Sequence, residues 1–469
     1  MLPLTEIPTI VSHYSSHFAG IFTPSDFSSF QRYISGLMIS ENKTIEAINR
    51  LFVFDSKSMM TLNRFLTQSK YEEWQVNQCR LDMLQSQSAT NFKPTGVLSI
   101  DNSQLSHYGE HFDLISFQKN HTKGSYEWLH DLVSLHYSDA TVDYPVFCRL
   151  WEPVDVVKLE TALRKENIFI NAQKAAQKET KPKQWKKYLL YRYGDYQHKK
   201  PALQKTYKTK IHWAKLLLIQ FNMLYPKVKL PVCFDHFYTE PYLCNFIDQE
   251  LDQIYIGSLE GRSKVVGAGG KLEELKDFTA QLVKQQKQEE QLLFKPYTIP
   301  YKGGKETYYA YSKIKRIKGF GRKKLVISFS KKDLSDRKPR YFICNQHQWQ
   351  AQTILAKRRH RWPIEVFYEE GKAEGLDKYQ LRNQTGIRKH IAAVAVVYSM
   401  LQMARQDAVL QQKLQCQFEQ QGEGSIAFWR RLTQADSFYR LVFYIMTMVK
   451  KGLDFEQIMK PFEEIIAYQ

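Results

Sequence analysis

Three features are missing from this 469-residue sequence, and each absence disfavours a class of protein. Its six cysteines include no C-x-x-C pair, which argues against a zinc module or a disulfide framework and for reduced thiols. The start of the chain has no basic segment followed by an apolar core, so we expect no signal peptide. The longest apolar run, about 391–404, contains polar residues and is shorter than the roughly 20 residues that span a bilayer. We therefore expect a cytoplasmic protein with no membrane partner.

Acidic residues are also scarce, with 48 Asp and Glu against 67 Lys and Arg, which gives a formal net charge of +19. Such an excess of positive charge repels itself unless a polyanion binds it, so nucleic acid is the first candidate partner and an anionic membrane surface the second. Hydrophobic residues make up 43% of the chain and aromatic residues 14%, which is enough for ordinary folded cores. The length suggests about three domains.

The order of patterns along the chain predicts five regions. Residues 1–90 have apolar side chains at helical spacing in 30–38 and 45–54, which indicates a helical domain that either binds DNA ends or serves only in packing. Residues 91–260 alternate buried strands with helices, 261–349 form a basic β-rich insertion, 350–410 carry two helices that close the core, and 411–469 are helical without visible chemistry. For the last region, dimerisation is only a default suggestion.

Two predicted strands are followed by an aspartate. Residues 96–101 form a short apolar run that ends at Asp101, and 230–235 form a second run that ends at Asp235. Carboxyl ends of neighbouring strands meet at one edge of a mixed α/β sheet, so the two carboxylates are expected to lie close together. Asp113, Asp131, Asp139 and Asp143 are alternatives to Asp101.

A third carboxylate is expected at the start of a helix. Pro363 is tolerated in a first helical turn, so the helix should begin within a residue or two of Trp362 and place Glu365 in that turn. Lys372, seven positions later, lies almost on one line with Glu365, beside an apolar stripe. A carboxylate at the rim of a core, with Arg361 and Lys372 nearby, suits a cation and a phosphate; a solvated charged helix face is the alternative.

Three converging carboxylates repel one another, and divalent cations would neutralise them. Mg²⁺ is the expected ion, because it prefers hard oxygen ligands and accepts substrate phosphate. Two such ions would activate an attacking hydroxyl and stabilise the leaving oxygen of an in-line displacement at phosphorus.

Two basic segments are candidates for DNA contact. Between residues 174 and 215 there are thirteen Lys or Arg and two acidic residues, with aromatic residues interleaved, which suits a phosphate backbone and unpaired bases; a solvated helix is the alternative. The insertion carries a second basic group. The candidates in these two segments are Lys186, Lys187, Arg192, Lys315, Arg316, Arg322 and Lys323.

In its order of strand-Asp101, strand-Asp235, insertion and helix-Glu365, the chain resembles the insertion-sequence DDE transposases that carry a Tyr-Arg-Glu-Lys signature. The spacing Arg361-x3-Glu365-x6-Lys372 carries the likeness, and Arg358 stands where the signature has tyrosine. The resemblance implies a ribonuclease-H-like core with a β insertion. It further implies that Asp101, Asp235 and Glu365 are catalytic metal ligands, and that Arg361 and Lys372 contact terminal phosphates. Arg358 would add a cation, and Trp362 could stack on an unpaired base.

The expected function is Mg²⁺-dependent cleavage of transposon ends and strand transfer into target DNA, with Mn²⁺ able to substitute. The partners would be terminal inverted repeats, target DNA and a second copy of the chain, in a prokaryotic cytoplasm at the nucleoid. Two alternatives remain open: a catalytically silent DNA-binding protein of the same fold, and a structure-specific nuclease.

Overall fold

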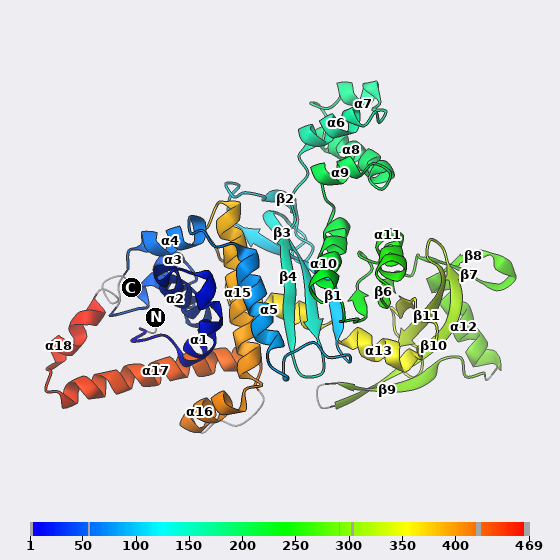
Figure 1. Ribbon diagram of the computed structural model, residues 1–469. Helices are drawn as coiled ribbons and strands as arrows, with labels where there is room; N and C mark the ends of the chain where they lie inside the picture. The colour runs from blue at the N-terminus through cyan, green and yellow to red at the C-terminus, as the bar shows by residue number, and fades with distance from the viewer. Residues whose placement is uncertain (1–2, 55–56, 290, 302–303, 419–423, 464–469) are drawn as a thin grey trace.

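The computed structural model describes residues 3–54, 57–289, 291–301, 304–418 and 424–463. Helices from both termini gather at one end of a long mixed sheet, and a hairpin-rich region forms its other end (Figure 1). Twelve described strands form the sheet in the order β2-β3-β1-β5-β6-β12-β11-β10-β7-β8, with β4 paired to β3 and β9 paired to β10.

The core of the sheet is an antiparallel meander joined to two parallel strands. β1 is antiparallel to β3, and β3 is antiparallel to β2 and β4, whereas β1, β5 and β6 run parallel. The parallel pairing of β1 with β5 covers three residue pairs, and the side chains of β5 are buried and apolar, as expected for a strand covered by helices on both faces. This α/β arrangement confirms the predicted ribonuclease-H-like mixed sheet. The strands are β1 (Val97–His107), β2 (Ser116–Lys119), β3 (Tyr126–Ser138), β4 (Asp143–Leu150), β5 (Val232–Phe234) and β6 (Tyr255–Leu259).

The prediction that Asp101 ends its strand is wrong. β1 continues to His107 because its outer part stays paired with β3, whereas its parallel partner β5 stops at Phe234. The last parallel pair is Ile100 opposite Phe234, so Asp101 and Asp235 are the next residues on the two strands. The expected convergence therefore follows from the end of the parallel pairing and not from the end of β1.

The insertion continues the core sheet, because β12 pairs with β6 and places Ile343 opposite Gly257. β10 and β11 form its long hairpin, and α12 packs near β7 and β8. Its elements are β7 (Lys264–Val266), η3 (Ala268–Gly270), β8 (Leu272–Glu274), α12 (Leu275–Glu289), β9 (Lys295–Tyr301), β10 (Gly304–Ile317), β11 (Gly321–Phe329) and β12 (Arg340–Cys344).

A small helical unit, α6 to α9, projects away from the sheet between β4 and α10 (Figure 1). It has its own core, in which Trp185 and Tyr193 are 5% and 1% exposed, so these two rings are not available to stack on bases. The elements of this stretch are α6 (Val156–Lys165), α7 (Ala172–Ala176), α8 (Pro182–Tyr196), α9 (Pro201–Thr206), α10 (Lys210–Leu224), α11 (Pro241–Asn245) and the π-helical turn η2 (Phe246–Glu250).

The N-terminal helices share one hydrophobic core with the central sheet and the helices that cover it. The long helix α15 is buried over most of its length and packs against α2, α4, α5, β4 and α17. The N-terminal elements are α1 (Thr9–Tyr14), η1 (Ser15–Ile21), α2 (Pro24–Ile39), α3 (Ile45–Arg50), α4 (Met59–Thr67) and α5 (Glu73–Gln85). In the part of the chain that is described, no helix has the length and apolar character needed to cross a membrane.

After the insertion, the regular elements in the described part of the chain are all helices. The elements are α13 (Ala351–Arg359), α14 (Pro363–Ala373), α15 (Gln384–Ala404), α16 (Ala408–Phe418), α17 (Ile426–Lys450), α18 (Phe455–Met459) and η4 (Lys460–Phe462). The region 411–469 was predicted to be helical, and residues 419–423 and 464–469 of it lie outside the described residues.

Candidate active site at the sheet edge

The three predicted carboxylates come from three segments that meet beside the N-terminus of α14. Asp101 lies in β1, and Asp235 directly follows β5. α14 begins at Pro363 with Trp362 as its N-cap, which confirms the predicted start and places Glu365 in the first turn. The Tyr368 hydroxyl, one turn later, donates a hydrogen bond of 3.0 Å to the Asp101 carbonyl oxygen and fixes α14 against β1.

Arg361 joins two of these carboxylates. Its Nη2 lies 2.5 Å from Asp101 Oδ2, and its Nη1 lies 2.5 Å from Glu365 Oε1. Only 6% of Arg361 is exposed. The sequence-based prediction assigned this side chain to a DNA phosphate, whereas in this conformation the guanidinium is a buried counter-ion of Asp101 and Glu365.

The carboxylates influence one another electrostatically. Burial raises the pKa of Asp101 to about 6, and the negative charges of Asp235 and Glu365 act in the same direction, against the opposing effect of Arg361. Burial would lower the pKa of Arg361, but the charges of Asp101, Glu365 and Asp235 outweigh it and raise that pKa. The site therefore concentrates negative charge that a cation must balance.

Asp235 is held by the turn that follows β5. Its Oδ1 accepts hydrogen bonds from the backbone N–H groups of Phe237 at 3.0 Å and Tyr238 at 3.3 Å. His236 lies between Asp235 and Glu260, with its Nε2 3.4 Å from Glu260 Oε1. The sequence analysis missed Glu260, although it follows β6, the parallel neighbour of β5, just as Asp235 follows β5 itself.

The donor chemistry of Asp101, Asp235 and Glu365 fits a hard divalent cation, because all three ligands are carboxylate oxygens. In the present conformation the Arg361 guanidinium lies between Asp101 and Glu365, so these two carboxylates are not arranged to bind one cation together. No group of three His, Cys, Asp or Glu side chains in the described ranges is placed to hold a metal ion. Arg361 would have to withdraw before a cation could bind both carboxylates.

A groove of about 730 Å³ opens beside Glu365, between α13, α14 and the insertion; we call it the arginine groove. Trp362, 48% exposed, lies on it. Arg358 reaches the Ser258 hydroxyl at 3.2 Å and lies over the Phe342 ring, and burial lowers its pKa to about 10, so it stays charged. The cations that line the groove are Lys338, Arg340, Arg358, Arg359 and Arg361.

Three of these cations, Lys338, Arg340 and Arg359, were not predicted as DNA contacts. The three consecutive basic residues at 357–359 could have identified Arg359 as a DNA-contact candidate. Lys338 and Arg340 could not be identified in this way, because only the pairing of β12 with β6 brings them to the groove. Lys372, which was predicted to act together with Arg361, lines a different groove, formed by the ends of β1 and β3. The structure thus separates the two basic residues of the signature.

The other predicted DNA contacts lie on the β10–β11 hairpin and on the projecting helical unit, and the prediction for one of them, Lys323, is wrong. Lys323 is 8% exposed and lies 2.6 Å from Asp248, so it serves as an internal ion-pair partner and not as a DNA contact. Arg316 and Arg322 lie opposite each other on the β10–β11 hairpin and are exposed, and Lys315 is half-buried beside them. Lys186, Lys187 and Arg192 lie on α8 in the projecting helical unit.

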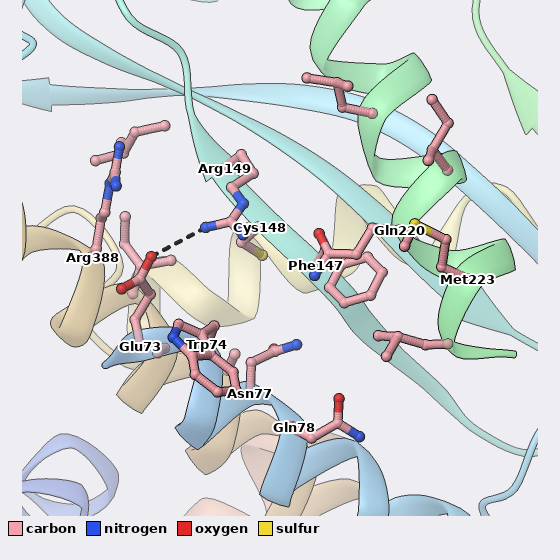
Figure 2. A pocket seen from close by; sticks show the side chains of 17 residues that line it. Glu73, Trp74, Asn77, Gln78, Phe147, Cys148, Arg149, Gln220, Met223 and Arg388 are labelled. Atoms are coloured by element: carbon pink, nitrogen blue, oxygen red, sulfur yellow. Dashed lines mark hydrogen bonds and ion pairs between the residues drawn. The ribbon is translucent and has the colours of Figure 1, made fainter. Parts of the chain in front are cut away.

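A separate cavity of about 330 Å³ lies between α5, β4, α10 and α15. Figure 2 shows Arg149 forming an ion pair with Glu73 across one side of it, at 3.1 Å, with Phe147 and Met223 on the other side. None of the predicted catalytic or DNA-binding residues lines this cavity.

No protein-family model matches the sequence, and no curated protein matches it. Among solved structures, the chain is similar to a piggyBac transposase, determined by cryo-electron microscopy in a synaptic complex with hairpin DNA. The two share 10% sequence identity with a TM-score of 0.42, over 92% of this chain and 79% of the other. At this TM-score the similarity supports no conclusion about function.

Proposed function

We propose that this protein is a DNA transposase that cleaves the ends of a mobile element and joins them to target DNA. The observation that carries the proposal is that Arg361 contacts both Asp101 and Glu365, while Asp235 directly follows the strand that pairs in parallel with β1. The net charge of +19 and the five cations of the arginine groove support a polyanionic substrate.

In this function the three carboxylates would hold Mg²⁺ or Mn²⁺. When bound, the metal would lower the pKa of the attacking hydroxyl and neutralise charge at phosphorus. Arg358 would hold the phosphodiester backbone in the arginine groove, and Trp362 would stack on a neighbouring base. Arg361 would exchange its bonds to Asp101 and Glu365 for a substrate phosphate, because a bidentate guanidinium suits both kinds of oxyanion. The proposed partners are terminal inverted repeats, target DNA and a second copy of the chain.

The test uses the full-length protein with a duplex that carries the DNA end flanking its gene, in the presence of Mg²⁺ or Mn²⁺. Wild type should nick the end and transfer the strand. Asp235→Asn should form no product yet bind the duplex normally, because the asparagine oxygen can still accept the bonds from Phe237 and Tyr238. Glu369→Gln, an exposed position on α14, is the matched control and should retain activity. Product from Asp235→Asn at the wild-type rate would refute the assignment.

The competing function is DNA binding without cleavage, favoured by one observation: Arg361 already contacts both Asp101 and Glu365 and offsets part of their negative charge. It predicts that wild type and Asp235→Asn behave alike, with salt-dependent binding and no metal-stimulated product. A structure-specific nuclease would give the hydrolysis product but no strand transfer.

A further inference from the structure

The groove that contains Lys372 carries a row of exposed aromatic rings, and we call it the aromatic groove. Its volume is about 750 Å³, and it lies between the outer ends of β1 and β3, the loop after Asn120 and the C-terminal half of α14. Tyr108, Phe117 and Tyr126 are exposed by 103%, 58% and 62%. Phe117 stacks on Tyr126 with ring centroids 5.9 Å apart and lies 5.4 Å from the Trp128 ring. Such rings are costly to expose unless a ligand covers them.

The aromatic row shares a sheet face with the candidate active site. Asp101 pairs with Ser134 and His107 pairs with Trp128, while Phe117 pairs with Trp128 from the other side. Because side chains alternate between faces, Asp101, His107, Trp128 and Phe117 lie on the same face. His107 is six residues beyond Asp101 on β1, which corresponds to about 20 Å.

The polar groups of the groove suit a nucleic acid strand. Lys123, Lys372 and Lys378 line it; Lys123 pairs with Glu127 at 3.2 Å and Lys378 with Asp377 at 3.8 Å, whereas Lys372 has no ion pair within the described chain. His107 is 9% exposed, and its Nε2 has no hydrogen-bond partner among the described residues. Burial lowers the pKa of His107 to about 3, so the ring is neutral at physiological pH. The Lys372 ammonium group suits a phosphate, and the exposed rings suit the faces of unpaired bases.

We infer that the aromatic groove binds an unpaired stretch of the DNA strand, with its bases stacked on Phe117, Tyr126 and Trp128 and its backbone held by Lys372. The inference rests on the proposed function and adds a binding site to it. Unpaired bases, rather than duplex, are the expected ligand because only an unpaired base presents its π-face to a ring. Lys372 on α14 would guide the strand from Glu365 into the groove.

The experiment measures binding of a fluorescent oligothymidylate of about 12 nucleotides, within the site sizes of stacking platforms, by anisotropy without divalent metal. The double variant Phe117→Ala/Tyr126→Ala should weaken binding at least about fivefold, the lower end of one stacking contact. Phe117→Trp should bind the oligothymidylate as tightly as wild type, since the larger ring still stacks. A blunt duplex should bind the double variant as it binds wild type. Phe169→Ala is the matched control, because Phe169 is 73% exposed on the projecting helical unit.

Equal affinity of wild type and the double variant for the oligothymidylate would overturn the inference. So would a double variant that changes only self-association in sedimentation, because the rings would then belong to a protein contact. The outcome is separable from the proposed function. If binding depends on the rings but the protein makes no cleavage product, the transposase function is refuted and strand binding by the aromatic groove stands. If the protein cleaves DNA but binding does not depend on the rings, only strand binding by the groove is refuted.

Discussion

Replacing Arg361 with methionine removes the only positive group that contacts both Asp101 and Glu365 among the described residues, and keeps a side chain of similar length. Removing one partner of a buried ion pair costs about 3 to 5 kcal/mol, because the remaining charge stays buried without compensation. Arg361 is 6% exposed, and the Asp101 side chain is 15% exposed, so solvent screens this pair only weakly. We expect Arg361→Met to lose an amount in that range from its free energy of unfolding at pH 8 without metal.

The loss of stability caused by Arg361→Met should increase as pH rises. The pKa of Asp101 is raised from 3.8 to about 6 in the folded wild type, so its ionisation destabilises the fold as pH rises from about 4 through 6. At 1.36 kcal/mol for each pKa unit, that interval corresponds to about 3 kcal/mol. Without Arg361 the folded-state pKa of Asp101 should rise further. The variant should therefore be near wild-type stability below pH 4 and lose most at pH 8.

Urea unfolding followed by circular dichroism at pH 4, 6 and 8, with and without Mg²⁺, measures the effect. If the carboxylates hold a cation once Arg361 is gone, Mg²⁺ at about 100 times its dissociation constant should return about 2.7 kcal/mol to the variant. Arg361→Met/Asp101→Asn is the control and should recover stability at pH 8 without metal. A cost that is the same at every pH would refute the assignment of Arg361 as a counter-ion.

Other predictions follow from single contacts. Lys210→Met should cost about 3 to 5 kcal/mol in urea unfolding, because Lys210 Nζ lies 2.6 Å from the fully buried Asp131 carboxylate; exposed Lys205→Met should change little. Arg316→Ala should reduce the slope of log affinity for DNA against log salt by about 1, whereas Lys323→Met should leave that slope unchanged and lower stability instead. Burial lowers the pKa of His390 from 6.5 to about 4, so wild type should lose stability as pH falls below 6.5, and His390→Gln should flatten that part of the unfolding profile.

Local patterns in the sequence predicted the elements that carry the candidate site. Pro363 marked the start of α14 because the restriction it imposes acts within one helical turn. The apolar runs before Asp101 and Asp235 identified β1 and β5 because parallel strands are buried on both faces. The continuation of β1 to His107 could not be seen in the same way, since it depends on antiparallel pairing with β3.

The partners of individual charges could not be predicted, because they depend on contacts between distant segments. Lys323 belongs to a basic cluster in the sequence, yet its partner Asp248 is 75 positions away. The aromatic residues between 174 and 215 are a different case, because a signal was present. Trp185, Leu189 and Tyr193 follow one another at intervals of four, which is the spacing of a buried helical stripe, and all three are buried in the core of the helical unit.

The geometry of α14 relates the two grooves to each other. Glu365 and Lys372 are seven positions apart, which is about 10 Å along a helix, or about the axial rise of three nucleotides in B-form DNA. A strand with its scissile phosphate at Glu365 would therefore place a later phosphate at Lys372, where the aromatic groove begins. The arginine groove lies at the opposite end of the helix, beside Trp362. In the proposed function, this helix would hold duplex DNA on one side of the reacting bond and unpaired DNA on the other, so Arg361 and Lys372 would serve one strand from separate grooves.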